Sequence, residues 1–124
     1  MLTYAIDSAR KRLDVQIVEA TSGPEIQTAI RNILADPAFK PSYTILIDLH
    51  GLVSTPTIPE LRDIALTVRA NAISSGARRA IVTESLLFYG LAELFSILTE
   101  GAATRYRAFR SRDEAELWLS ASFS

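Results

Sequence analysis

Asp48 and His50 are the two residues of this sequence whose types and spacing most suggest chemistry. They lie at the end of an apolar run from Thr44 to Leu49, and side chains two residues apart on a strand point to the same side. A carboxylate beside an imidazole can orient it as a general base, and Ser54 or Ser85 would complete a hydrolytic set. Neither serine has the GxSxG spacing of a nucleophile elbow. We therefore expect a polar site rather than an enzyme, with an Asp48/His50 hydrolase as the alternative.

The composition argues against metal and cofactor chemistry. The chain has no Cys and one His, which excludes thiolate sites and multi-histidine centres. Its five glycines form neither GxGxxG nor GxxxxGK[ST], so a cradle for nucleotide phosphates is not indicated. Thirteen Lys plus Arg against fourteen Asp plus Glu give a net charge of −1. We expect no metal, no cofactor and no nucleic-acid partner.

Three hydroxyl residues are each followed by Glu three positions later, the spacing of a helix capping box. They are Ser22, Thr57 and Ser111. A phosphate on a hydroxyl that begins a helix would lie against free N–H groups and the positive end of the helix dipole. The loop before the second helix therefore contains candidate phosphoacceptors, which are Ser54, Thr55 and Thr57.

Hydrophobic periodicity predicts the elements that position these residues. Alternation predicts an antiparallel hairpin of strands 2–6 and 13–19, and apolar runs predict interior strands at 44–49 and 80–82. An edge strand is expected near 105–108. Helical spacing predicts helices over about 22–36, 57–74, 86–100 and from 111 onward.

The predicted order is β-β-α-β-α-β-α-β-α, which indicates one α/β domain over 1–124. Its sheet should have five strands, mostly parallel, with one antiparallel strand from the N-terminal hairpin. The chain is 48% hydrophobic and 22% charged, as expected of an ordinary globular domain. The N-terminal residues lack the pattern of a secretory signal, and no apolar run reaches the ~20 residues of a membrane span. We expect a cytoplasmic protein.

The third helix is more apolar than packing on one sheet requires. Apolar residues surround most of it and leave only Gly90, Glu93, Ser96 and Glu100 as a polar stripe. The surplus can be covered by the protein's own core, by a second copy in a homodimer, or by an apolar ligand. The residues that would distinguish these alternatives are Leu87, Leu91, Leu94 and Leu98.

Three motifs together resemble the SpoIIAA-like family, bacterial proteins of the broader STAS and CRAL-TRIO-like grouping. The first is Ala35–Pro41 leading into Ile45–Gly51, and the second is Tyr89–Ala92 with Phe95. The third is Phe109–Leu119, which is similar to the family's C-terminal pattern. The resemblance implies a small α/β domain of successive strand and helix units.

The resemblance also implies a regulatory or binding role. Some anti-sigma-factor antagonists of the superfamily are switched by phosphorylation of a Ser that follows an Asp; this chain has Pro56 and Thr57 at those two positions, so the switch is not carried over. We therefore expect a non-enzymatic binding module, forming a homodimer and acting through a protein partner. The alternative is a carrier of a small apolar or lipid-like ligand, which predicts an enclosed apolar cavity.

Overall fold

The computed structural model describes residues 1–54, 56–71, 77–100 and 105–121. Its strands are β1 (Leu2–Asp7), β2 (Arg12–Ile17), β3 (Glu19–Ala20), β4 (Thr44–Asp48), β5 (Leu52–Ser54), β6 (Arg78–Val82) and β7 (Arg105–Phe109). Its helices are α1 (Gly23–Ala35), α2 (Ile58–Ala70), α3 (Leu86–Leu98) and α4 (Arg112–Ser120).

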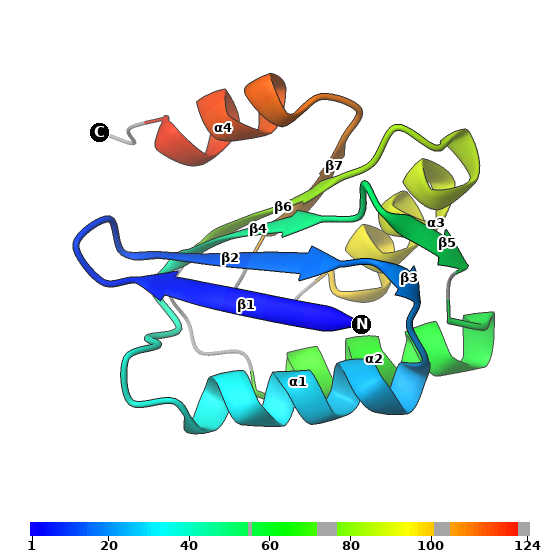
Figure 1. Ribbon diagram of the computed structural model, residues 1–124, viewed down its shortest axis with the longest axis horizontal. Helices are drawn as coiled ribbons and strands as arrows, with labels where there is room; N and C mark the ends of the chain where they lie inside the picture. Colours follow the sequence, from blue (N-terminus) through cyan, green and yellow to red (C-terminus); the bar gives the residue numbers. More distant parts are fainter. Residues whose placement is uncertain (55, 72–76, 101–104, 122–124) are drawn as a thin grey trace.

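The main sheet has five strands in the order β1-β2-β4-β6-β7 (Figure 1). Strand β1 is antiparallel to β2, and the pairs β2–β4, β4–β6 and β6–β7 are parallel. The five strands, the antiparallel N-terminal hairpin, the parallel remainder and the edge position of β7 confirm the sequence prediction.

A second, two-stranded sheet of β3 and β5 was not predicted. It forms because the chain bends after β2 and brings the backbone N–H of Glu19 within 2.8 Å of the Gly51 carbonyl oxygen. A Cβ on Gly51 would lie 2.8 Å from Cγ1 of Val18, so the close approach requires glycine. The sequence had indicated only a loop between His50 and Pro56.

The capping hydroxyls begin the helices as predicted. Ser22, Thr57 and Ser111 each accept a hydrogen bond from the backbone N–H three residues later. The reciprocal bond of a full capping box forms at α2. At α1 and α4 the box prediction is only half right, because only the hydroxyl accepts its bond; at α1, Glu25 reaches the terminal amine of Met1 instead (3.4 Å). Helix α2 ends at Ala70, earlier than predicted, and the expected stop at 74–76 lies outside the described residues.

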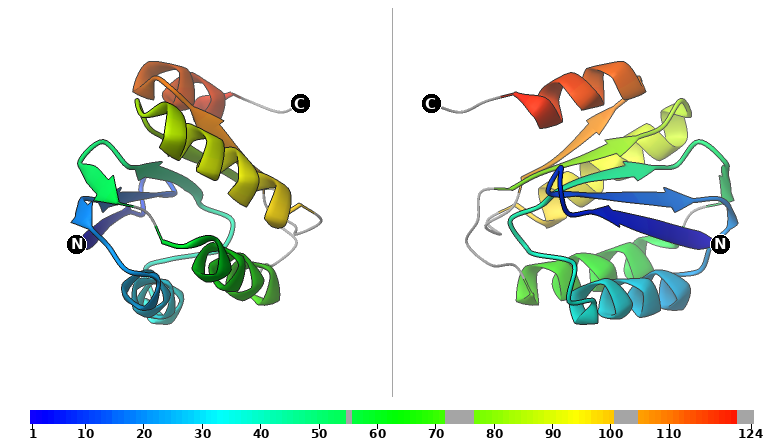
Figure 2. Two further views of the ribbon diagram at one scale, coloured as in Figure 1. Left: turned by 90° about the vertical axis from the view of Figure 1, so that its right-hand side faces the viewer. Right: turned by 60° about the vertical axis from the view of Figure 1, so that its left-hand side comes forward.

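The described helices cover the two faces of the sheet unequally. Helix α4 lies on one face, and α1 and α2 lie side by side on the other (Figures 1 and 2). Helix α3 packs on that second face against β7, since Ala92 and Phe95 share a buried cluster with Ala108. No helix in the described ranges is long and apolar enough to cross a bilayer.

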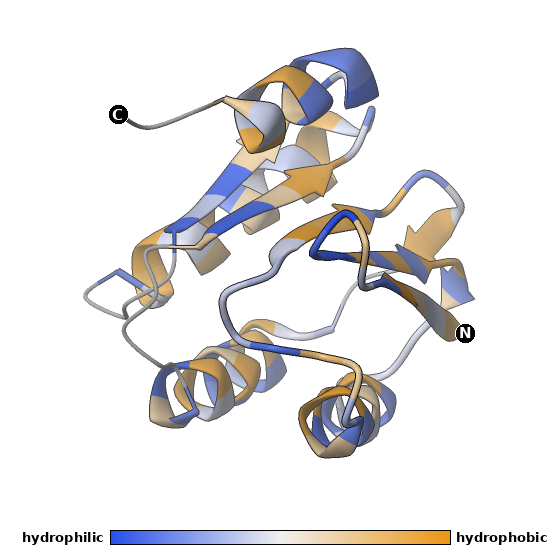
Figure 3. Cartoon of the chain, turned by 90° about the vertical axis from the view of Figure 1, so that its left-hand side faces the viewer, coloured by the Kyte–Doolittle hydropathy of each residue, from blue (hydrophilic) through white to orange (hydrophobic). Residues whose placement is uncertain are grey.

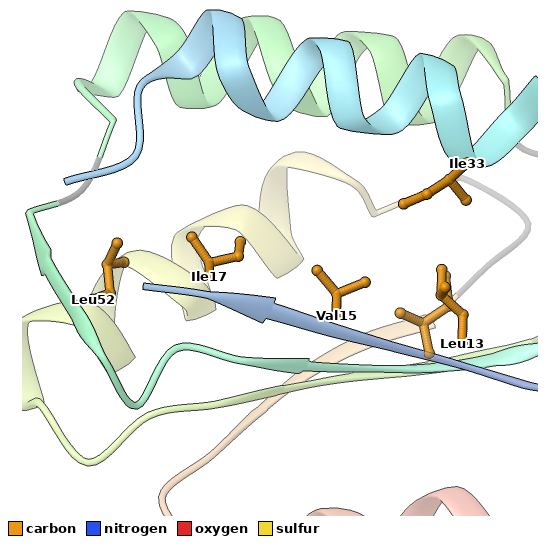
Figure 4. Close-up of a cluster of buried hydrophobic side chains, with 6 residues drawn as sticks. Leu13, Val15, Ile17, Ile33 and Leu52 are labelled. Atoms are coloured by element: carbon orange, nitrogen blue, oxygen red, sulfur yellow. The ribbon is translucent and has the colours of Figure 1, made fainter. Parts of the chain in front are cut away.

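Buried apolar residues form one cluster under α4 and two clusters on the opposite face. The first of those two joins β2 to α1. Figure 4 shows Leu13, Val15 and Ile17 of β2 pointing toward α1, from which Ile33 points back. Hydrophilic residues gather instead at the turn between β1 and β2 (Figure 3). The side of the sheet that faces α1–α3 therefore holds two clusters of buried residues, and the half-buried Ile47 and Leu49 pack against both of them.

Candidate ligand-binding site

Asp48 has a structural role at the carboxyl edge of the sheet. Its Oδ1 accepts a hydrogen bond from the backbone N–H of His50 (2.8 Å), and its Oδ2 lies 3.3 Å from Nη1 of Arg112. The His50 side chain is 69% exposed, with Nδ1 3.9 Å from Oε2 of Glu84. Both residues line a polar depression of about 330 Å³. The Asp48 carboxylate nevertheless holds the loop and α4 rather than the imidazole.

Ion pairs around a buried arginine tie α4 to the sheet. Arg12 is 5% exposed, and its guanidinium donates to both carboxylate oxygens of Glu116 (2.6 and 2.7 Å) and to Asp14 (3.0 Å). The hydrogen bond to Glu116 raises the pKa of Arg12. The same bond lowers the pKa of Glu116 below its ordinary value. This charged group is fully paired and is therefore structural.

The hydroxyl residues suggested as nucleophiles or phosphoacceptors do not form one site. Thr57 Oγ1 accepts from the N–H of Glu60 (3.3 Å), and Glu60 Oε1 accepts from the N–H of Thr57 (2.9 Å). The second of these bonds lowers the pKa of Glu60. Ser85 caps α3 by accepting from the N–H of Phe88 (3.3 Å). Ser54 is exposed in β5, and Thr55 lies outside the described residues.

An apolar cavity of about 200 Å³ lies between the sheet and helices α1, α2 and α3. Members of both apolar clusters on this face line it, together with Ile47 and Leu49, which pack against both clusters. Its volume exceeds the ~150 Å³ of an engineered cavity that holds benzene and falls below the ~300 Å³ at which sites for drug-sized ligands begin. The cavity can accept a small apolar molecule or a single alkyl chain.

The four leucines singled out on α3 do not share one environment. Leu91 lines the cavity together with Phe88, and Leu98 packs partly buried against the cluster that includes Phe95. Leu94 is half-buried, and Leu87 is 69% exposed. Leu91 therefore faces the cavity, whereas Leu87 faces outward.

The sheet register places a charged residue in the wall of this cavity. On β6, Arg79 and Ile81 point to the same side, and both line the cavity. Arg79 pairs with Ile45 of β4 on one side and with Tyr106 of β7 on the other. The guanidinium thus belongs to a row of otherwise uncharged side chains at the amino ends of the parallel strands.

Arg79 is 9% exposed and uses few of its hydrogen-bond donors. Its Nη1 donates to the hydroxyl oxygen of Tyr106 (3.2 Å), and its Nη2 donates to the carbonyl oxygen of Pro41 (3.3 Å). Its buried Nε has no hydrogen-bond partner. The Tyr106 ring lies 5.7 Å from the guanidinium carbon and packs edge-on against Phe95. In the described parts of the chain, the oxygens that accept hydrogen bonds from Arg79 are neutral.

Sequence reasoning missed Arg79. It lies just before the interior run Ala80–Val82 and resembles an ordinary polar flank of a strand. The signal that could have indicated its burial is its position in the strand. β6 pairs with a neighbour on each side, and Arg79, its second residue, is buried as expected in a central strand.

No family model matches the chain, and no curated protein matches it. Among solved structures, it is similar to an uncharacterised protein of the DUF3478 family from Shewanella loihica PV-4, which has a SpoIIAA-like fold. The superposition has a TM-score of 0.62 at 15% sequence identity and covers 95% of this chain and 93% of the other. The resemblance stated from the sequence motifs is confirmed at the level of the fold: this chain has the SpoIIAA-like α/β fold.

Proposed function

We propose that this protein binds a small apolar ligand in the cavity between its sheet and helices α1–α3, and that it acts by binding rather than by catalysis. The observation that carries the proposal is the cavity itself, about 200 Å³ and lined mainly by aliphatic and aromatic side chains. The carrier hypothesis from the sequence required an enclosed apolar space; the observed cavity is apolar, but it is partly open to solvent. A concave, mostly apolar site with a few polar groups is the usual form of a small-molecule site.

The energetic cost of such a space supports a functional interpretation. An enclosed empty cavity destabilises a protein by about 24 cal/mol per Å³, so about 200 Å³ costs at most roughly 5 kcal/mol, and less where water enters the open side. Total stabilities of domains are only about 5–15 kcal/mol. A bound apolar molecule would restore the missing contacts and recover part of this free energy.

The test is a titration with 1-octanol, a neutral molecule with one alkyl chain, followed by isothermal calorimetry and thermal unfolding. Saturable binding at one site should raise the unfolding temperature. At 100 times the Kd the gain is about 2.7 kcal/mol, or roughly 10 °C for a domain of this size. A linear, non-saturable response, or none, would overturn the proposal.

A homodimer through α3 is the second candidate, favoured by the outer face of that helix. Leu86, Leu87 and Ile97 are 73%, 69% and 64% exposed. Gly90 lies between them, and a Cβ built on it meets nothing within 4 Å. Glycine costs about 1 kcal/mol relative to alanine inside a helix. Here it leaves room for the backbone of a second copy to approach.

Sedimentation velocity tests this candidate at micromolar concentration. Wild-type protein should sediment as a species of twice the 13.6 kDa mass of the chain, and Ile97→Glu should sediment as a monomer. The matched control is Leu117→Glu, because Leu117 is 72% exposed but lies on α4. A monomeric wild type refutes the dimer and leaves the ligand proposal standing.

A further inference from the structure

The cavity wall carries a cation whose charge the described residues do not balance. Arg79 lines the cavity and is nine-tenths buried. Only two of the five N–H donors of a guanidinium are used, in bonds to the neutral oxygens of Tyr106 and Pro41. No ion pair joins Arg79 to any carboxylate among the residues that the structure describes.

Arg12, a buried arginine on the opposite face of the sheet, under α4, gives the contrast. Arg12 is similarly buried, at 5% exposed, but it forms ion pairs with Glu116 and Asp14. A buried charge is normally paired, since the transfer of an ion out of water is expensive. Arginine cannot avoid this cost by losing its proton. Arg79 therefore has no counter-ion among the described residues, and an anionic ligand can supply one.

The geometry provides a second donor beside the guanidinium. The Tyr106 oxygen accepts from Nη1 of Arg79 (3.2 Å), which leaves the hydroxyl hydrogen free to donate, and Tyr106 also lines the cavity. A carboxylate placed here would accept charge-assisted hydrogen bonds from both groups. The two side chains come from neighbouring strands in register, so the rigid sheet holds them together.

We propose that the ligand is a single-chain alkyl carboxylate whose head group binds Arg79 and Tyr106 and whose chain fills the apolar cavity. This inference rests on the proposed function. The chain would run from the amino ends of the strands toward Leu49, because Ile45, Ile47 and Leu49 all line the cavity. Ile45 and Leu49 are four residues apart, roughly 13 Å along an extended strand, which is comparable to a medium-length alkyl chain. The volume of about 200 Å³ has no room for a two-chain lipid.

Calorimetric titration of the wild-type protein with four octyl compounds tests the head group. The compounds are octanoate, octyl phosphate, 1-octanol and octylammonium. Octanoate should bind at least about 10-fold more tightly than 1-octanol, because hydrogen bonds that involve a charged group contribute more than neutral ones. Octylammonium should bind most weakly. Octyl phosphate that binds as well as octanoate would assign the site to anionic heads in general and overturn the carboxylate assignment.

Two variants locate the effect. Arg79→Met should remove the preference for octanoate, so that the ratio of the affinities for octanoate and 1-octanol falls to about one. Tyr106→Phe keeps the ring that packs against Phe95 and should weaken octanoate several-fold. If Arg79→Met does not fold, the role of Arg79 and Tyr106 in binding the head group is still decided by the wild-type series together with Arg79→Gln and Tyr106→Phe. Equal affinities of wild type for octanoate and 1-octanol would refute the head-group inference alone, whereas no binding of either would refute the proposed function as well.

Discussion

Replacement of Ala29 by Leu should fill part of the cavity. Ala29 lies on α1 and lines the cavity between Ile26 and Ile33, which face the same side of that helix. Leucine and alanine are both strong helix formers, so the substitution adds volume without changing the intrinsic stability of α1. Ala35 is exposed at the end of the same helix and does not line the cavity. Ala35→Leu is therefore the matched control.

The magnitude follows from the added side chain. Leucine carries three more carbons than alanine, and each buried methylene contributes about 0.8 kcal/mol, which totals about 2.4 kcal/mol. Ordering the leucine side chain costs about 0.5–1 kcal/mol. The net expectation is a gain of about 1–2 kcal/mol in the free energy of unfolding, or roughly 3–8 °C in the unfolding temperature.

Urea unfolding monitored by far-ultraviolet circular dichroism measures this gain. Ala29→Leu should raise the midpoint, and Ala35→Leu should change the free energy of unfolding by no more than about 0.5 kcal/mol. The same filled variant should bind 1-octanol at least 10-fold more weakly than wild type. A loss of about 1–3 kcal/mol in Ala29→Leu is the signature of overpacking and would show that the core has no space at this position.

Three further predictions concern single elements of the fold. Glu116→Gln should weaken the dependence of the free energy of unfolding on pH at acidic pH. Hydrogen bonds from Arg12 lower the pKa of Glu116 in the folded protein. The Glu116 carboxylate therefore stabilises the fold above its unfolded-state pKa, and this stabilisation is lost as the pH falls through its folded-state pKa. Urea midpoints from neutral to acidic pH measure this, and parallel curves for both proteins would contradict it. Thr57→Ala should cost about 1 kcal/mol by removing the cap of α2, and an unchanged urea midpoint would show that the cap is dispensable. Gly90→Ala should stabilise the monomer by up to about 1 kcal/mol, since nothing in the described residues opposes the added Cβ; destabilisation in the urea assay would mean that the glycine has another role.

Local patterns explain how much of the fold could be predicted. The alternation of Leu13, Val15 and Ile17 identifies a strand with one buried face, and the hydroxyl of Thr57 marks the first turn of a helix. These signals are local because side-chain periodicity follows from the backbone geometry of each element. Right-handed connection of the units then limits the topology. The small sheet of β3 and β5 was missed because its pairing depends on a bend that no periodicity marks.

The candidate site could not be predicted in the same way, because it depends on contacts between distant residues. The carboxylate of Asp48 is held by Arg112, 64 positions later, a contact that its spacing from His50 does not indicate. Arg79 is buried only because β4 and β7 flank it. The cavity results from the distance between the sheet and its helices, which the amphipathic patterns of α1 and α2 do not specify.

Methyl-resolved NMR during a 1-octanol titration tests most directly whether the cavity binds apolar ligands. We predict saturable shifts, with one common Kd, at the methyl groups of the cavity residues Ile30, Ile47 and Leu91. The exposed methyl groups of Val53 and Leu117 should not follow that curve. Uniform small shifts at all five residues, or shifts confined to the exposed pair, would contradict a ligand-binding cavity.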